Sequence, residues 1–228
     1  YVYLGIFYKK RHYNNKLMHK KINKPPIFWQ KAKKALYNKD KKLSKIIESY
    51  PQDFLFSKSD PFFTLARSIV GQQISVKAAQ SVWDRLEAKV GKISPKIIIK
   101  THSNTLKSVG LSRQKVNYLK NIANAFIEKK IKLNMWNKMT NEEIIQDLIQ
   151  IKGIGRWTAE MFLIFNLCRA DIFPLDDIGM IKALCKLHNI PYPTSREVVI
   201  RIGEKWKPYR SVATWYLWRS LDPIPVEY

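Results

Sequence analysis

The stretch IKGIGRWTAE, residues 151–160, combines a glycine turn with the start of a helical pattern. Gly153 and Gly155 flank one isoleucine, and glycine lets the backbone adopt positive φ and approach a ligand closely. The first N–H groups of the following helix have no partner within the helix and carry the positive end of its dipole. The stretch therefore predicts a backbone site for an anion such as a phosphate group. A hairpin whose glycines serve only its own geometry remains an alternative.

A pair of acids in FPLDDIGMIK forms the second group of residues suited to chemistry. Asp176 and Asp177 stand at a predicted helix start, where the helix dipole favours an ionised carboxylate. Aspartate at such a place is commonly an N-cap, which satisfies free backbone N–H groups. A carboxylate held there can also stabilise positive charge that develops during a reaction. The two acids compete for these two roles.

The charge balance indicates a polyanionic partner. The chain of 228 residues has 41 Lys and Arg against 18 Asp and Glu, a formal charge of 41 − 18 = +23, and a pI of about 10.0. Such an excess favours nucleic acid, although the codon bias of an AT-rich genome would also enrich lysine. Residues 9–24 contain seven Lys and Arg and no acid. They predict a flexible basic arm, either a phosphate contact or a tail without a role.

Several classes of protein are excluded or disfavoured by composition. Cys168 and Cys185 are too few for a disulfide framework, a cysteine-ligated iron–sulfur cluster or a four-cysteine zinc site. No apolar run reaches the roughly 18 residues that span a membrane. The N-terminal apolar block precedes the basic block, which is the wrong order for a secretory signal. We therefore expect a cytoplasmic protein without a membrane partner.

Helical periodicity and caps dominate the elements that must position these residues, so we predict an all-α protein of about ten helices. Residues 1–25 form the basic arm, and residues 26–228 form one helical domain with two lobes, a cleft between them and a hairpin at about 141–168. Thr140 and Glu143 predict a capping box. The predicted helices cover residues 28–37, 42–50, 61–71, 76–91, a short one from 95, 113–127, 141–150, 156–167, 177–187, 196–206 and 209–221.

Four motifs in order resemble the helix–hairpin–helix (HhH-GPD) base-excision DNA glycosylases. The family pattern L-x-x-[IL]-x-G-[IV]-G-x-x-T-A stands here as Leu148, Ile151, Gly153, Ile154, Gly155, Thr158 and Ala159. ARSIVGQQIS precedes it, FPLDDIGMIK follows, and EKWKPYRSVATWYLW is similar to the last helix of the 3-methyladenine DNA glycosylase II branch. The resemblance extends over residues 29–221 and implies an active site in the cleft between the two lobes.

The resemblance implies an N-glycosyl hydrolase that flips alkylated bases out of double-stranded DNA. Bifunctional relatives have a lysine nucleophile where this chain has Trp157, so we expect base removal without strand cleavage. The substrates expected are of the 3-methyladenine and 7-methylguanine type. We expect a monomer that needs no cofactor, with the carbonyl groups of the hairpin as a candidate site for a monovalent cation.

The resemblance also assigns roles to individual residues. Asp177 is expected to be catalytic, in preference to Asp176, because the family's aspartate is followed by two residues and then an apolar helix residue. Ser112 and Lys115 are candidate phosphate contacts or simply part of a capped surface helix, and Gln72 is expected to be structural. The remaining assignments are Trp157 and Trp218 as walls of the base pocket, Gln73 as the wedge, and Gly153, Gly155, Thr158 and Lys152 as phosphate-binding residues.

Each assignment has an ordinary alternative. Tryptophans on apolar helices are more often core residues, and glutamines at a helix end are often plain surface residues. A glycosylase for deaminated bases and a catalytically inactive DNA-binding protein are the alternative functions. Asp177 argues against the inactive protein, because a pure binder does not need a carboxylate that faces DNA.

Overall fold

The structure, a computed structural model, describes residues 24–57 and 60–222. The described residues form twelve α-helices and one 3₁₀ helix and contain no strand, which confirms the predicted all-α class. Apart from residues 24 and 25, the predicted basic arm lies outside the described residues. No helix within the described ranges is long and apolar enough to cross a membrane.

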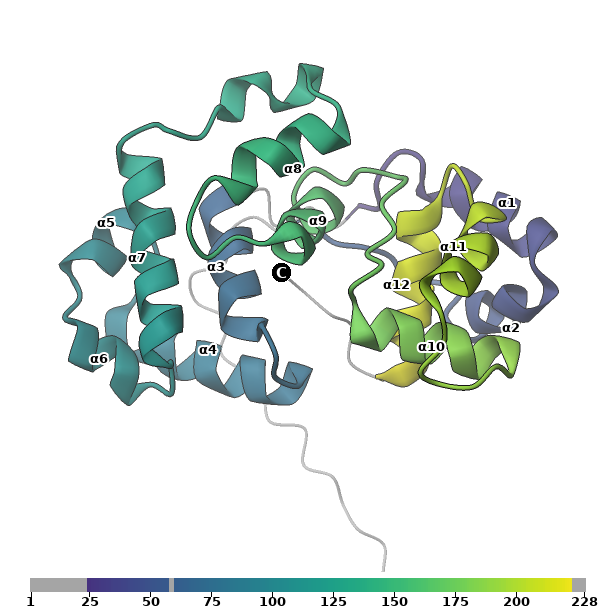
Figure 1. The fold of residues 1–228 in the computed structure, drawn as a ribbon, viewed down its shortest axis with the longest axis horizontal. Coiled ribbons are helices and arrows are strands. Elements are labelled where there is room, and N and C mark those ends of the chain that lie inside the picture. The colour runs from purple at the N-terminus through teal and green to yellow at the C-terminus, as the bar shows by residue number, and fades with distance from the viewer. Residues whose placement is uncertain (1–23, 58–59, 223–228) are drawn as a thin grey trace, which may run out of the picture.

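The helices form two groups on either side of α9 (Figure 1). One group holds α3 to α8, and the other holds α1, α2, α10, α11 and α12. In chain order the elements are α1 (Trp29–Lys39), α2 (Lys41–Ser49), α3 (Pro61–Gly71), α4 (Val76–Val90), α5 (Pro95–Lys100), α6 (Ser103–Ser108), α7 (Arg113–Ile127), η1 (Leu133–Lys138), α8 (Asn141–Ile149), α9 (Arg156–Phe165), α10 (Ile178–His188), α11 (Arg196–Glu204) and α12 (Arg210–Leu221).

One hydrophobic core extends through both groups. In the first group α3 packs against α4, α7 and α9, while α8 packs against α9. In the second group α12 packs against α1, α2 and α10. Apolar positions at helical spacing make this possible, since they give each helix a continuous stripe to bury. Helix α9 is buried along most of its length, from Thr158 to Phe165, and so fixes its first turn against the rest of the molecule.

Helix starts follow the caps that the sequence predicts. Among the helices with an N-cap side chain that accepts a hydrogen bond from the backbone of the first turn are those capped by Asp60, Ser75, Ser94, Ser112 and Ser195. Thr140 and Glu143 form the predicted capping box of α8. Two elements were not predicted, α6 and η1, each only six residues long and without a side-chain cap. Neither is long enough to show a helical period.

Candidate active site

The hairpin between α8 and α9 has the geometry that an anion site requires. Gly153 has φ +113°, and a Cβ atom there would overlap the ring of Tyr118, so both conformation and space demand glycine. Gly155 is different: it has φ −93° and is the N-cap of α9. Nothing lies within 4 Å of the position of a Cβ atom at Gly155, and no side chain caps this helix. The first turn of α9 is therefore open to an approaching ligand.

A cavity of about 370 Å³ lies in front of this turn. Its lining brings together the end of α3, the start of α7 and the hairpin: Gln72, Gln73, Ser112, Gln114, Lys115, Tyr118, Gly153, Ile154 and Gly155. The starts of two helices thus converge on one cavity, and the positive ends of two dipoles favour an anion there. The contribution of Tyr118 and Gln114 was missed, because no local pattern links α7 to the hairpin.

Two predicted phosphate ligands do not fit this geometry through their side chains. Thr158 is only 1% exposed, and its hydroxyl accepts a hydrogen bond from Gln72 Nε2 at 3.0 Å. The Nζ atom of Lys115 donates to the carbonyl groups of Val70 and Gln72 at 2.8 Å each, so it caps the end of α3. Burial lowers the pKa of Lys115 from its ordinary value.

The two neighbouring glutamines have separate environments. The Nε2 atom of Gln72 also donates to the carbonyl oxygen of Gly153 at 3.3 Å, which ties the end of α3 to the hairpin. This bond agrees with the structural role expected for Gln72. Gln73 is exposed and has a left-handed backbone conformation with φ 59°. Lys152 is also exposed, and its carbonyl oxygen accepts a hydrogen bond from Asn121 at 3.0 Å. The wedge and phosphate roles of Gln73 and Lys152 stay predictions.

Asp177 is held by three N–H donors at the start of α10. It is the N-cap of this helix, and its Oδ1 accepts from the backbone N–H of Met180 at 2.6 Å and from Trp218 Nε1 at 2.9 Å. Its Oδ2 accepts from Trp157 Nε1 at 2.8 Å. The residue is only 9% exposed. Gly179 leaves room for this arrangement, because a Cβ atom there would lie 3.3 Å from Asp177 Oδ1.

Asp176 has none of these features. Its side chain is 52% exposed and forms an ion pair with Arg196 at 2.7 Å. From the sequence, we expect one of the two acids to be the N-cap and Asp177 to be the catalytic residue. In the structure the cap is Asp177, so the residue predicted to be catalytic also holds the start of the helix.

Trp218 differs from the pocket wall that the sequence predicted. Its ring stacks on Phe165 with centroids 5.6 Å apart and an interplanar angle of 13°. With 8% exposure it presents almost no surface on which a base could stack. Its position makes it a hydrogen-bond donor that orients Asp177, a role hidden in the sequence because 41 residues separate the two.

Trp157 is only partly buried. It lies in the first turn of α9, one residue from the open helix start, and its Nε1 reaches across to α10. The ring therefore links the predicted anion site to the carboxylate. Its predicted role as a wall of the base pocket is compatible with this position and stays a prediction.

Comparison with known proteins shows the family. The description "HhH-GPD superfamily base excision DNA repair protein" matches residues 66–208, and the chain belongs to this family. A curated relative from Schizosaccharomyces pombe, DNA-3-methyladenine glycosylase 1, is 35% identical over 184 residues, which are 79% of this chain and 81% of the relative.

Solved structures agree with this assignment. The S. pombe 3-methyladenine DNA glycosylase in complex with abasic DNA has a TM-score of 0.75 and 32% identity, covering 83% of this chain and 96% of that one. The 3-methyladenine DNA glycosylase of Archaeoglobus fulgidus has a TM-score of 0.69 and 26% identity, covering 86% of this chain and 76% of that one.

Proposed function

We propose that the protein is a monofunctional DNA glycosylase that removes alkylated bases from double-stranded DNA. The observation that carries this proposal is the carboxylate of Asp177, which three N–H donors orient at a helix start. The relatives named as 3-methyladenine glycosylases, one of them bound to abasic DNA, support the substrate class. We also propose that the protein acts as a monomer in the cytoplasm and needs no cofactor.

Asp177 suits the hydrolysis of an N-glycosidic bond. As the bond between the base and the sugar breaks, positive charge develops on the sugar, and a nearby carboxylate stabilises it. The base departs with the bonding electrons, a water molecule adds to the anomeric carbon, and the proton that this water loses passes to the surrounding solvent. Two indole donors and one backbone donor hold the carboxylate in a fixed position while this charge develops.

An alkylated base is an easier leaving group than a normal base. Methylation at N3 of adenine or N7 of guanine makes the base cationic, so it departs as a neutral molecule. Such a reaction needs little help from a general acid. The partly buried ring of Trp157 would attract the cation by about 0.5–2 kcal/mol beyond ordinary stacking.

The DNA strand has a complementary binding site in the cavity of Gly153 and Gly155. The open start of α9 would hold one phosphate through backbone N–H groups, and this contact is independent of base sequence. Gln73 would fill the gap that the flipped base leaves, and its contacts there would offset part of the free-energy cost of unstacking that base. The high positive charge adds attraction along the backbone.

The test is to incubate the full chain with DNA methylated at N3 of adenine or N7 of guanine and to measure released bases. Release of free base with an intact strand supports the proposal. Release only from DNA that contains deaminated bases would assign a different lesion, and binding without release would identify an inactive DNA-binding protein. A covalent adduct trapped by borohydride would show an amine nucleophile and overturn the monofunctional assignment.

A further inference from the structure

The chain turns sharply where α3 ends, at the predicted wedge Gln73. Gln72 has φ −53° and ψ 128°, and Gln73 has φ 59°. These angles are typical of a type II turn over residues 71–74, whose third residue has a positive φ and is usually glycine or asparagine. The hydrogen bond that closes the turn, from the N–H of Ile74 to the carbonyl oxygen of Gly71, is long at 3.4 Å. A glutamine in this strained conformation therefore needs support from outside the turn.

Lys115 of α7 supplies this support. Its Nζ atom donates to the carbonyl oxygens of Val70 and Gln72 at 2.8 Å each. The amine is partly buried, and burial lowers its pKa from the ordinary value. The carbonyl of Gln72 belongs to the peptide that joins the two central residues of the turn, and type I and type II turns differ mainly in the orientation of that peptide. By binding its oxygen, Lys115 selects the type II orientation and, with it, the left-handed φ of Gln73.

The side chain of Gln72 ties the same turn to the hairpin. Its Nε2 atom donates to Thr158 Oγ1 at 3.0 Å and to the carbonyl oxygen of Gly153 at 3.3 Å. Residue 72 is thus fixed at both its carbonyl and its side chain, whereas Gln73 is exposed. Glycine would adopt the conformation of Gln73 without strain, so an exposed glutamine there indicates that its side chain has a use.

We propose that Lys115 is a positioning residue, which holds Gln73 ready to enter the gap that a flipped base leaves. This inference rests on the proposed function, because it requires that Gln73 is the wedge. A wedge that is oriented before DNA binds loses less conformational freedom when it enters the duplex, so extrusion of the target base becomes easier. Lys115 acts through the backbone of the turn and touches neither the base nor the sugar in this account.

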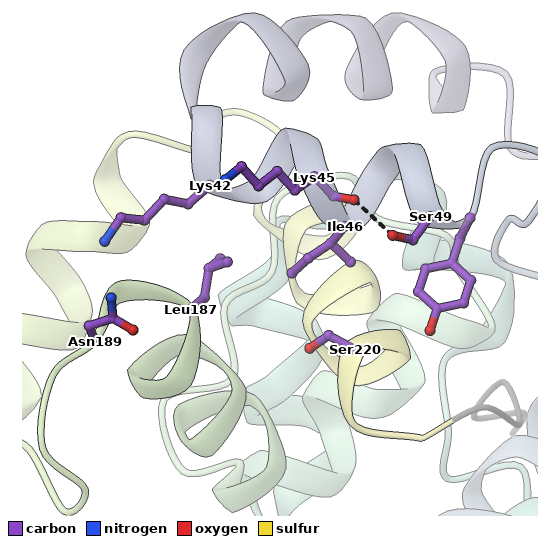
Figure 2. Close-up of a pocket in the computed structure, with 8 residues that line it drawn as sticks. Lys42, Lys45, Ile46, Ser49, Leu187, Asn189 and Ser220 are labelled. Atoms are coloured by element: carbon purple, nitrogen blue, oxygen red, sulfur yellow. Dashed lines mark hydrogen bonds between the residues drawn. The ribbon is translucent and has the colours of Figure 1, made fainter.

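A lysine in the other group of helices makes a similar contact and provides a matched control. Lys42 of α2 extends toward Asn189 beside a cavity of about 430 Å³ (Figure 2). Its Nζ atom donates to the carbonyl oxygen of His188 at 3.2 Å, and the next residue, Asn189, has φ 55°. Both lysines thus bind the carbonyl that precedes a left-handed residue. Asparagine adopts this conformation readily, and Lys42 is exposed, so its contact should have no effect on base flipping.

The first experiment reports on the wedge without any base release. The full chain is bound to a duplex in which tetrahydrofuran, a stable abasic analogue, lies opposite 2-aminopurine, whose fluorescence depends on its stacking. We expect the wild type to change this fluorescence, and Gln73→Ala and Lys115→Met each to reduce the change by at least about half at saturating protein. Lys115→Arg, which keeps a cationic donor, should restore most of it, and Lys42→Met should match the wild type. An undiminished change with Lys115→Met or with Gln73→Ala would overturn the proposal.

The second experiment separates positioning from a purely structural role. Single-turnover release of 3-methyladenine from duplex DNA should fall about tenfold with Lys115→Met. When Gln73 is already alanine, the same change should reduce the rate by at most about twofold, because a lysine that acts only through Gln73 has nothing left to position. An equal loss in both backgrounds would overturn the proposal and leave Lys115 as a structural cap. If the wild type releases no base, the proposed function fails, and the fluorescence experiment still decides the role of Lys115.

Thermal melts accompany each variant, because loss of two hydrogen bonds also destabilises the end of α3, and rates are compared per folded molecule. If Lys115→Met does not fold, Lys115→Gln takes its place in both experiments. This variant keeps a polar head group in the partly buried site, while its shorter side chain weakens the contact with Gln72. Its effect should depend on Gln73 in the same way, and a loss that is independent of Gln73 would again overturn the proposal.

Discussion

Two buried aspartates, Asp40 and Asp177, have the same local chemistry in different parts of the molecule. Each is the N-cap of a helix, α2 or α10, and they are 8% and 9% exposed. Each accepts a hydrogen bond from an indole: Asp40 from Trp206 at 2.9 Å, and Asp177 from both Trp157 and Trp218. Capping and burial therefore do not distinguish Asp177, the carboxylate proposed to be catalytic, from Asp40.

The surroundings of the two carboxylates make the difference. Asp40 accepts two backbone N–H bonds, from Lys42 and Leu43, and its indole donor Trp206 is fully buried. Asp177 accepts one backbone N–H bond, and one of its indole donors is the partly exposed Trp157, next to the open start of α9. The comparison teaches that the partly exposed donor, rather than the carboxylate, indicates where substrate can approach.

The largest effect should come from Asp177→Asn. This change removes the charge that stabilises the sugar cation, and single-turnover release of 3-methyladenine should fall by about 10³-fold or more. Binding to duplex DNA should stay intact or become tighter, because a negative charge near phosphates is lost. Asp40→Asn should release base at the wild-type rate per folded molecule. If Asp176→Asn is inactive while Asp177→Asn is active, the catalytic assignment is reversed.

Asp40→Asn and Asp177→Asn should lower the free energy of unfolding by similar amounts. An asparagine retains one acceptor oxygen but turns its amide toward an N–H donor, so each variant should lose about 1–3 kcal/mol of unfolding free energy.

Burial alone raises the pKa of Asp40, but hydrogen bonds from Leu43, Trp206 and Lys42 hold it below its ordinary value.

The pH dependence of the Asp40 contribution has a definite sign. Because the folded pKa is lowered, the stabilisation is fully present above the unfolded value of 3.8 and is lost as the pH falls through the folded value. Denaturant melts of wild type and Asp40→Asn should therefore converge in acid. A difference that grows below pH 3.8 would contradict this account.

Local features of the site could be predicted from the sequence, whereas contacts across the chain could not. The hairpin and the two acids follow from glycine spacing, caps and a helix start, which are all properties of a few neighbouring residues. Asp177 and Trp218 meet only because α10 packs against α12, and nothing near either residue signals that contact. The hydrogen bond from Gln72 to the Thr158 hydroxyl is likewise a contact between distant parts of the chain, so the sequence does not reveal that this hydroxyl is already occupied.

A smaller effect is expected for Trp218→Phe. The phenylalanine ring keeps the stack on Phe165 but lacks the N–H that binds Asp177 Oδ1. The looser carboxylate should reduce excision by about tenfold. The factor should be the same for cationic and neutral lesions, since this ring is only 8% exposed and offers little surface to a base. Single-turnover rates on both lesion types test this. If the excision rate falls only for cationic bases, Trp218 is a wall of the base pocket, as the sequence predicts.

The most selective effect, a change in a ratio of two rates, separates the two proposed functions of Trp157, as donor to Asp177 and as platform for a cationic base. Trp157→Phe removes the N–H and keeps a ring face, so the ratio of 3-methyladenine to hypoxanthine excision should change little. Trp157→Leu removes the face as well, and this ratio should fall by about 2- to 30-fold, the equivalent of 0.5–2 kcal/mol. Both variants lose the same hydrogen bond, so the difference between their ratios isolates the ring. Thermal melts provide the control: if Trp157 is merely a core residue, Trp157→Leu should lose stability and activity on both lesions in equal proportion, and the ratio should not move.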